Sequence, residues 1–184
     1  DTTLNEKCLT ELGLSSCQCR PGFARLTPRT ACIPVLSLSI SFRVDRMNDK
    51  KVQFTRALLN ANTEDYQYLE YESLLALNSM FTATKSLSTE LMGVKVNRFY
   101  SVGGRTIVNA TISLRAEGND TNPAAVPGNL KRTLSQELTH AIASNANQLG
   151  ESQLWVDSSA SAIIRVDDLN ECASAEHSDC SRHA

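Results

Sequence analysis

The chain has 184 residues and a formal net charge of −2 at pH 7, with 18 lysines and arginines against 20 aspartates and glutamates. This near balance, without a long basic run, argues against a nucleic-acid-binding surface. The most apolar run, 33–44, is interrupted by three serines and an arginine, so it is too short and too polar to span a bilayer. The length leaves room for one ordinary domain with small appendages.

Cysteines occur only near the two ends of the chain. The long middle stretch has none, so it has to bury a core without covalent staples. Together with two N-glycosylation sequons, at Asn109 and Asn119, the clustered cysteines favour a secreted or ectodomain setting, where disulfides persist. Metal ligation or free thiols are the alternative, although the Cys17-Gln18-Cys19 spacing does not match a zinc knuckle. The six cysteines are Cys8, Cys17, Cys19, Cys32, Cys172 and Cys180.

The first cysteine-rich piece contains the run Cys19-Arg20-Pro21-Gly22-Phe23, in which Pro-Gly is a turn signal. One residue separates Cys17 from Cys19, so in a strand their side chains point to opposite faces and each needs a different partner. This pattern resembles the second half of an EGF-like module, from its third to its sixth cysteine. The resemblance implies a Cys19–Cys32 disulfide and places the family partners of Cys8 and Cys17 upstream. In this segment, those two are either free or paired with each other.

The middle stretch opens with a strand at 35–44, where five apolar residues alternate with serines and an arginine. Period-two alternation over ten residues predicts a strand with one buried face. A charged loop at 45–51 and a helical turn near 54–59 follow. A helix is then expected at 64–85, because Thr63 is a suitable N-terminal cap and the apolar residues recur at helical spacing.

Two further strands are predicted at 91–102 and 105–116, joined by a turn at Gly103-Gly104. Both show partial or full alternation of apolar and polar residues. In the second strand, Asn109 lies opposite the apolar set, on a face that is compatible with a glycan.

A loop at 117–127, which contains the second sequon, leads to a second helix with an apolar stripe from Leu130 to Ile142. Two short runs, 153–157 and 161–166, form either one bent strand or a strand pair. The order is strand, helix, strand, strand, helix, strand. This order predicts an α+β fold with an antiparallel sheet and both helices on one face, a ferredoxin-like β-α-β-β-α-β arrangement.

Such a domain between cysteine-stapled pieces resembles a SEA module, over roughly 35–166. The run Leu38-Ser39-Ile40-Ser41-Phe42-Arg43-Val44 is similar to the family's first strand. The run that starts at Gly104 lies where the family has Gly-Ser-Val-Val-Val followed by an alternating strand. This resemblance implies that 34–166 is the SEA domain and that 1–33 is the C-terminal part of an EGF-like module.

The resemblance also bears on self-cleavage. In self-cleaving members, the serine after the glycine attacks the preceding peptide carbonyl, and strain in the turn drives an N-to-O acyl shift. Here Arg105 stands at the serine position, and an arginine cannot act as this nucleophile. We therefore expect a degenerate cleavage loop that does not cut, made of Gly103, Gly104, Arg105 and Thr106.

The last piece, 167–184, contains the run Asp168-Leu169-Asn170-Glu171-Cys172, which resembles the opening of a calcium-binding EGF-like module. Oxygen ligands suit the hard Ca²⁺ ion. The resemblance implies side-chain ligands from Asp168 and Glu171, a carbonyl from Leu169, and a motif position for Asn170. The later ligands would follow the segment, so calcium belongs to the intact protein and is expected to bind weakly or not at all here. A polar linker is the alternative, and Cys172 and Cys180 lack their family partners.

These resemblances imply a segment of a longer extracellular protein with a structural or adhesion role. The EGF–SEA–EGF layout is similar to nematode transmembrane proteins that attach epidermis and muscle to the cuticle, with a fibrillin-like matrix protein as the alternative. Partners would be matrix or cuticle proteins, or glycans, and the parent protein is either secreted or membrane-anchored. A self-cleaving mechanosensitive ectodomain is the competing function.

An enzyme is the least supported class. His140 and Glu137 on the second helix could suggest acid–base chemistry, but neither a nucleophile nor a set of metal ligands accompanies them in the sequence. We therefore predict that this pair belongs to a solvated helix face and that the chain is not an enzyme.

Overall fold

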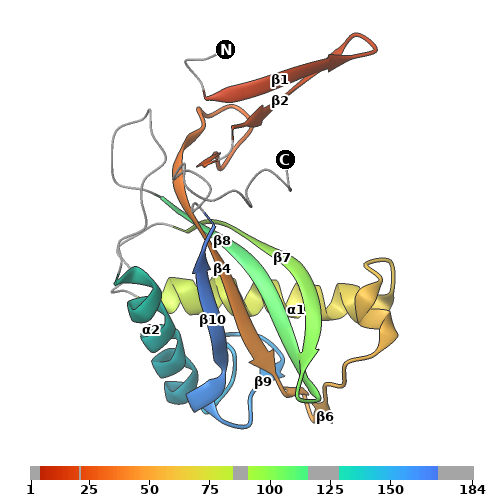
Figure 1. Cartoon of the computed structure of the whole chain (residues 1–184), viewed down its shortest axis with the longest axis vertical. Coiled ribbons are helices and arrows are strands. Elements are labelled where there is room, and N and C mark those ends of the chain that lie inside the picture. Colours follow the sequence, from red (N-terminus) through yellow and green to blue (C-terminus); the bar gives the residue numbers. More distant parts are fainter. Residues whose placement is uncertain (1–4, 21, 85–90, 116–128, 170–184) are drawn as a thin grey trace, which may run out of the picture.

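The computed structural model describes residues 5–20, 22–84, 91–115 and 129–169. It is an α+β fold with antiparallel sheets and two helices (Figure 1), so the predicted class is confirmed. The main sheet has the strand order β10-β4-β8-β7, and each neighbouring pair is antiparallel. Its strands and the helices are β4 (Ile33–Val44), α1 (Glu64–Ala83), β7 (Leu91–Val102), β8 (Arg105–Arg115), α2 (Leu130–Ser144) and β10 (Ile163–Asp168).

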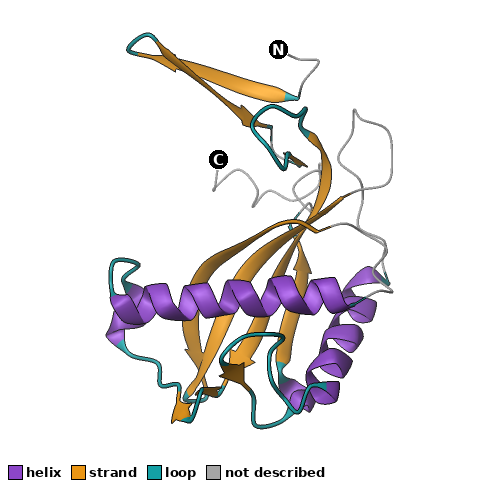
Figure 2. Cartoon of the chain, turned by 180° about the vertical axis from the view of Figure 1, so that it is seen from behind, coloured by secondary structure: helices purple, strands orange, loops and turns teal. Residues whose placement is uncertain are grey.

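The core lies between the main sheet and the two helices. Alternation along β4 places Leu38, Ile40 and Phe42 on one side of the strand, where all three are fully buried. Leu77 of α1 and Leu138 of α2 belong to the same buried cluster, so both helices pack against one face of the sheet. Figure 2 shows α1 running across that face. Burial of each such side chain stabilises the fold by about 1.5–3 kcal/mol.

Helix α1 begins at Glu64, directly after the capping residue that the sequence indicates. The hydroxyl of Thr63 accepts a hydrogen bond from the backbone N–H of Tyr66 at 3.3 Å, which satisfies one of the free donors of the first turn. The Tyr66 ring packs edge-on against Phe99 of β7, with ring centroids 4.8 Å apart. Burial, and secondly the charge of Glu70, raise the pKa of the Tyr66 phenol above its ordinary value of 10.0.

The second face of β4 differs from the prediction. Its alternation predicts a solvated face, but Ser41 and Arg43 are each only 4% exposed. For Arg43, the reason is a distant segment, 157–162, which covers this end of the strand. The Ser41 hydroxyl instead accepts a hydrogen bond from Asn109 Nδ2 at 2.9 Å. The backbone N–H of Arg43 donates to the carbonyl of Ala162 at 2.8 Å, and its guanidinium donates to the carbonyl of Ser158 at 2.6 Å.

Two other stretches also differ from expectation. The predicted charged loop 45–51 contains two short paired strands, β5 and β6. The runs near 153–157 and 161–166 are neither one bent strand nor a pair with each other, because β9 pairs with β5 while β10 pairs with β4. Strands of two residues are too short to leave a periodic signal. The small elements are β5 (Arg46–Met47), β6 (Lys50–Lys51), η2 (Arg56–Leu59), β9 (Leu154–Trp155) and η3 (Ser159–Ser161).

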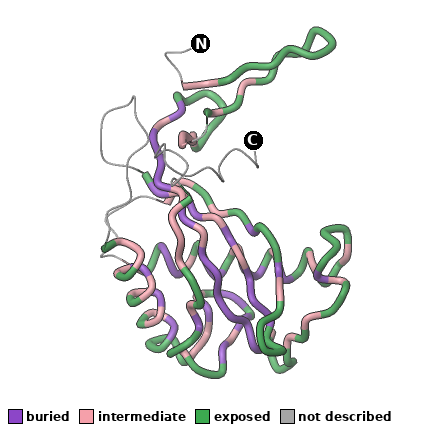
Figure 3. Tube along the Cα trace, viewed as in Figure 1, coloured by how far each residue is buried: buried purple, intermediate pink, exposed green. Residues whose placement is uncertain are grey.

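The N-terminal part consists of a hairpin, β1 (Glu6–Glu11) with β2 (Leu14–Cys19), and a short strand β3 (Phe23–Ala24). β3 pairs with the first two residues of β4, and β4 joins β8 from Val35 onward. Strand β4 therefore starts directly after Cys32 and is shared by the disulfide-bonded part and the main sheet. Figure 3 shows that the hairpin is largely exposed, whereas burial is concentrated along the main sheet and the helices.

Candidate functional site

The β7–β8 turn corresponds to the expected cleavage loop. Val102 pairs with Arg105, so Gly103 and Gly104 form a two-residue hairpin turn. Their φ angles are +57° and +77°, in the left-handed region that a type I′ turn requires and that glycine adopts without a steric penalty. Because no side chain is forced into this region, the turn lacks the backbone strain that bulkier residues would store there.

Arg105 is the residue that the resemblance to SEA modules aligns with the nucleophilic serine. Its side chain is 51% exposed, and its Nη1 lies 3.3 Å from Oδ1 of the buried Asp45. Asp45 follows the last residue of β4, so this ion pair ties the β7–β8 turn to the end of the neighbouring central strand. A guanidinium offers no hydroxyl for acyl transfer, and the contact gives Arg105 a structural role instead.

Asp45 also belongs to a second set of contacts. Its Oδ2 accepts hydrogen bonds from Arg43 Nε at 2.9 Å and from the backbone N–H of Asp157 at 2.6 Å, while the Arg43 guanidinium reaches the carbonyl of Ser158. We name Arg43, Asp45 and the segment 157–162 the buried clamp. The side chains of Arg43 and Asp45 are 4% and 6% exposed. A buried ion pair needs additional hydrogen bonds of this kind to offset the desolvation of its charges.

Thr106, the last residue of the expected cleavage loop, is a core residue. It is fully buried, and its Oγ1 has no hydrogen-bond partner within the described part of the chain. It lies opposite Val44 of β4 and Ser101 of β7. Burying an unpaired hydroxyl costs about 1–3 kcal/mol, so packing, and not hydrogen bonding, accounts for this position.

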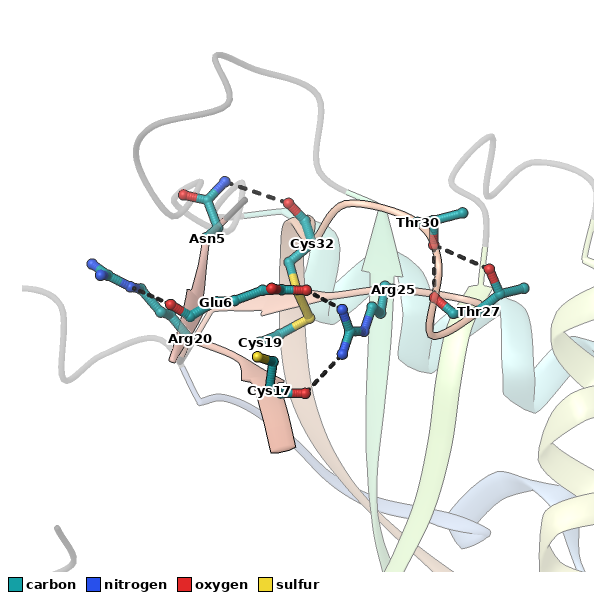
Figure 4. Close-up of a disulfide and its surroundings, with 9 residues drawn as sticks. All are labelled: Asn5, Glu6, Cys17, Cys19, Arg20, Arg25, Thr27, Thr30 and Cys32. Carbon is teal, nitrogen blue, oxygen red and sulfur yellow. Dashed lines mark hydrogen bonds and ion pairs between the residues drawn. A yellow bond between two sulfur atoms is a disulfide. The ribbon is translucent and has the colours of Figure 1, made fainter. Parts of the chain in front are cut away.

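Two disulfides fasten the N-terminal part, Cys8–Cys17 and Cys19–Cys32. The second is the pair that the EGF-like resemblance implies. The first is one of the two options left open for Cys8 and Cys17, and it joins residues directly opposite each other in β1 and β2. Figure 4 shows Arg25 beside Cys17 and the Cys19–Cys32 disulfide, with an ion pair to Glu6, the first residue of β1, and a hydrogen bond of 2.8 Å to the Cys17 carbonyl. Arg25 thus holds the hairpin against the Cys19–Cys32 loop.

One group of metal-ligating side chains lies in this part. Glu6, Cys8 and Cys17 place three potential ligand atoms within 4.8 Å of one another. The two sulfur atoms are bonded to each other, so they are not the thiolates that bind metal ions. The group is therefore not a metal site while the disulfide is closed.

Asn109 of the first sequon lies on the outer face of β8, a central strand of the main sheet. Its Nδ2 donates to the hydroxyls of Ser39 and Ser41 at 3.0 and 2.9 Å, and its Oδ1 accepts from Asn97 at 3.0 Å. Thr111, the third sequon residue, also hydrogen-bonds to Asn97. A glycan replaces one hydrogen of Nδ2, so glycosylation here would remove at least one of the two serine contacts.

The first half of the expected calcium motif lies at the end of β10. Asp168 pairs with Leu38 of β4, and the backbone N–H of Leu169 donates to the carbonyl of Ser37 at 3.0 Å. A carboxylate and a main-chain carbonyl are hard oxygen donors of the kind that Ca²⁺ prefers, so these two residues fit the ion by donor type. Five expected site residues lie outside the described residues: Asn119, Asn170, Glu171, Cys172 and Cys180.

A cavity of about 930 Å³ lies between α1, α2 and the loop after α2, and it is lined in part by Glu137 and His140. His140 is exposed, and its Nε2 lies 3.5 Å from the hydroxyl of Ser144. This distance is longer than the 2.6–3.2 Å of a working nucleophile–base pair.

Within the described residues, no helix is long and apolar enough to cross a membrane. No protein-family model matches the chain, and a search of curated proteins found no match. The likeness to EGF-like and SEA modules therefore rests on the sequence motifs alone.

Proposed function

We propose that this chain belongs to an extracellular structural or adhesion protein, in which a SEA-like domain that does not cleave itself connects EGF-like modules. The parent is either a secreted matrix protein or a single-pass membrane protein. It links cells to the extracellular matrix or to a cuticle, and its partners are matrix or cuticle proteins or their glycans.

The strand order of the main sheet carries this proposal. The order β10-β4-β8-β7, with one helix between β4 and β7 and the other between β8 and β10, supports a ferredoxin-like β-α-β-β-α-β arrangement, which is the arrangement of SEA modules. This domain continues without a linker from a part with two disulfides. Disulfides are typical of extracellular proteins, so the setting is compatible with a matrix or ectodomain role.

The residues of the β7–β8 turn support the proposal that the domain does not cleave itself. Gly103 and Gly104 relax the backbone of the turn, and Arg105 replaces the hydroxyl nucleophile with a cation paired to Asp45. Self-cleavage needs both a nucleophile and a strained peptide bond. The alternative function, a self-cleaving mechanosensitive ectodomain, therefore has less support.

Calcium would serve the intact protein at the junction after β10. Asp168 and Glu171 would donate side-chain oxygens and Leu169 its carbonyl, next to Asn170 of the same motif. Ca²⁺ bound by such ligands would stiffen the connection to the following module. A glycan at Asn119, or one at Asn109 that replaces a serine contact, would be consistent with the same extracellular setting.

Retention in extracellular matrix tests the proposal. The full chain, secreted from animal cells and labelled, is incubated with matrix laid down by cultured epithelial cells and washed at high salt. We expect the disulfide-bonded chain to be retained well above the same chain after reduction and alkylation. Equal retention of the two forms would contradict an adhesion role for the folded modules.

Measurement of chain integrity separates the two candidate functions. After enzymatic removal of glycans, we expect a single species of about 20.1 kDa on a denaturing gel and by mass spectrometry. Two fragments that separate at the Gly104–Arg105 bond would favour the self-cleaving alternative.

A further inference from the structure

The main sheet places the two strands that lead out of the domain side by side. β4 receives the chain from Cys32, and β10 carries it away after Asp168. The two strands are antiparallel neighbours, and the backbone N–H of Leu169 donates to the carbonyl of Ser37 near the start of β4. The chain therefore enters and leaves the sheet at the same end, as Figure 1 shows for β4 and β10.

We propose that this domain is a tension-sensitive element that opens by peeling β10 from β4 and stops at the buried clamp. The inference depends on the proposed function only for the source of the tension, which is a pull between the modules on either side. The direction of opening is set by the fold itself.

The disulfides direct an N-terminal pull to β4. Tension applied before Cys8 crosses to Cys17 through the first bond and from Cys19 to Cys32 through the second. Residues between the paired cysteines are bypassed and cannot extend while the bonds are closed. The load then reaches Ile33, the first residue of β4, with little slack.

The geometry of the two strands makes the β10–β4 pair the weak point. Hydrogen bonds between antiparallel strands run perpendicular to the strands. A pull that separates the start of β4 from the end of β10 acts along these bonds and loads them one at a time, beginning at Leu169 and Ser37. By contrast, a pull along β4 against β8 would shear ten residue pairs, from Val35↔Arg115 to Val44↔Thr106, at once.

The buried clamp supplies the stop. Peeling proceeds from Leu169 to Ile163, which pairs with Phe42. The next contacts form a cluster of hydrogen bonds. The backbone N–H of Arg43 donates to the carbonyl of Ala162, and its guanidinium donates to the carbonyl of Ser158 and the hydroxyl of Ser161. The carboxylate of Asp45 accepts from the backbone N–H of Asp157. These bonds share the load, so opening pauses after residues 163–169 are released. Seven extended residues correspond to roughly 24 Å of chain.

Single-molecule force spectroscopy on the full, oxidised chain tests this opening. Handles at the two chain ends apply the peeling pull. Handles at the N-terminus and at a cysteine introduced in the exposed β7–β8 hairpin (Val102→Cys) apply a shearing pull on β4 and β8. We expect the first event of the end-to-end pull to free seven residues, or about 24 Å of extended chain. The force of this event should be less than half the force of the first event in shear. Equal forces in the two geometries, or a single step in the peeling pull, would overturn the proposal.

Two variants test the clamp as the stop. Asp45→Asn keeps the shape of the side chain but removes its charge, and Arg43→Met removes the cation while filling similar space. We expect either variant to shorten or abolish the pause and to leave the force of the first event unchanged. Lys95→Ala, on the exposed edge strand β7, is the matched control and should keep the pause. A pause of wild-type length in both clamp variants would refute the role of the clamp. If the chain opens in two steps but the oxidised chain is retained in matrix no better than the reduced one, the proposed adhesion function is wrong and the proposed opening is not affected.

Discussion

Removal of the Asp45 carboxylate should destabilise the domain far more than any change on its surface. In Asp45→Ala, three donors lose their acceptor: Arg43 Nε, Arg105 Nη1 and the backbone N–H of Asp157. Arg43 is then a buried cation, 4% exposed, without its counter-ion. Breaking a buried ion pair from one side typically costs about 3–5 kcal/mol.

The expected change in melting temperature follows from the size of the domain. A domain of this length loses about 3 °C per kcal/mol, so a loss near 4 kcal/mol lowers Tm by about 12 °C. Thermal and urea unfolding, followed by circular dichroism under oxidising conditions, measure this difference. Arg105→Ala is the matched control, because it removes a half-exposed partner of the same carboxylate and leaves the Arg43–Asp45 pair in place. It should cost less than about 1 kcal/mol.

A double substitution separates the loss of the pair from the penalty for an unpaired charge. Arg43→Met with Asp45→Leu replaces both charges by apolar groups of similar size, which is often neutral or stabilising at buried pairs. We expect the double variant to be more stable than Asp45→Ala. If Asp45→Ala costs less than 1 kcal/mol, or if Arg105→Ala costs as much as Asp45→Ala, the reasoning about the clamp is wrong.

Four further predictions concern single positions. Arg105→Ser should remain uncut, because the glycine turn lacks strain; two fragments on a denaturing gel would show otherwise. Gly150→Ala should cost about 1–3 kcal/mol in urea unfolding, since its φ is +59° and a Cβ would clash with the Ser79 hydroxyl and lie 2.7 Å from the backbone carbonyl oxygen of Ala76. Asn109→Ala should cost about 1–3 kcal/mol, because it leaves polar partners on a half-buried sheet face unpaired. The raised pKa of Tyr66 favours its neutral form in the folded state, so its contribution is full below pH 10.0 and is lost as the pH rises through the folded pKa; Tyr66→Phe should weaken the loss of stability at alkaline pH.

The regular elements could be predicted because local patterns determine them. The alternation in 35–44 and 105–116 corresponds to β4 and β8, which pair along nearly their whole length. Thr63 marks the start of α1, and two adjacent glycines mark the β7–β8 turn. In each case, the signal and the structure involve residues close together in the sequence.

The buried clamp could not be predicted because its partners are far apart in the sequence. Arg43 and Asp45 contact the segment 157–162, which lies more than a hundred residues later in the sequence. The only local sign was an arginine at an outward position of an otherwise serine-lined strand face, two residues before an aspartate. That pattern equally fits an exposed surface ion pair, which contributes little. The placement of β9 and β10 in two different sheets could not be predicted either, because their partners β5 and β4 are also far away in the sequence.

The same hairpin can serve two different responses to force, and the residues at its turn favour one of them. In a self-cleaving domain, the peptide bond in the turn is already broken, and tension separates the two fragments irreversibly. Here the turn holds relaxed glycines, and Arg105 is paired with Asp45. A pull that leaves this turn intact has to be relieved at the other edge of the sheet, where β10 is held to β4 by a few hydrogen bonds. Those bonds can reform once tension falls, so we expect this domain to open and close repeatedly, with refolding visible in successive pulling cycles on one molecule.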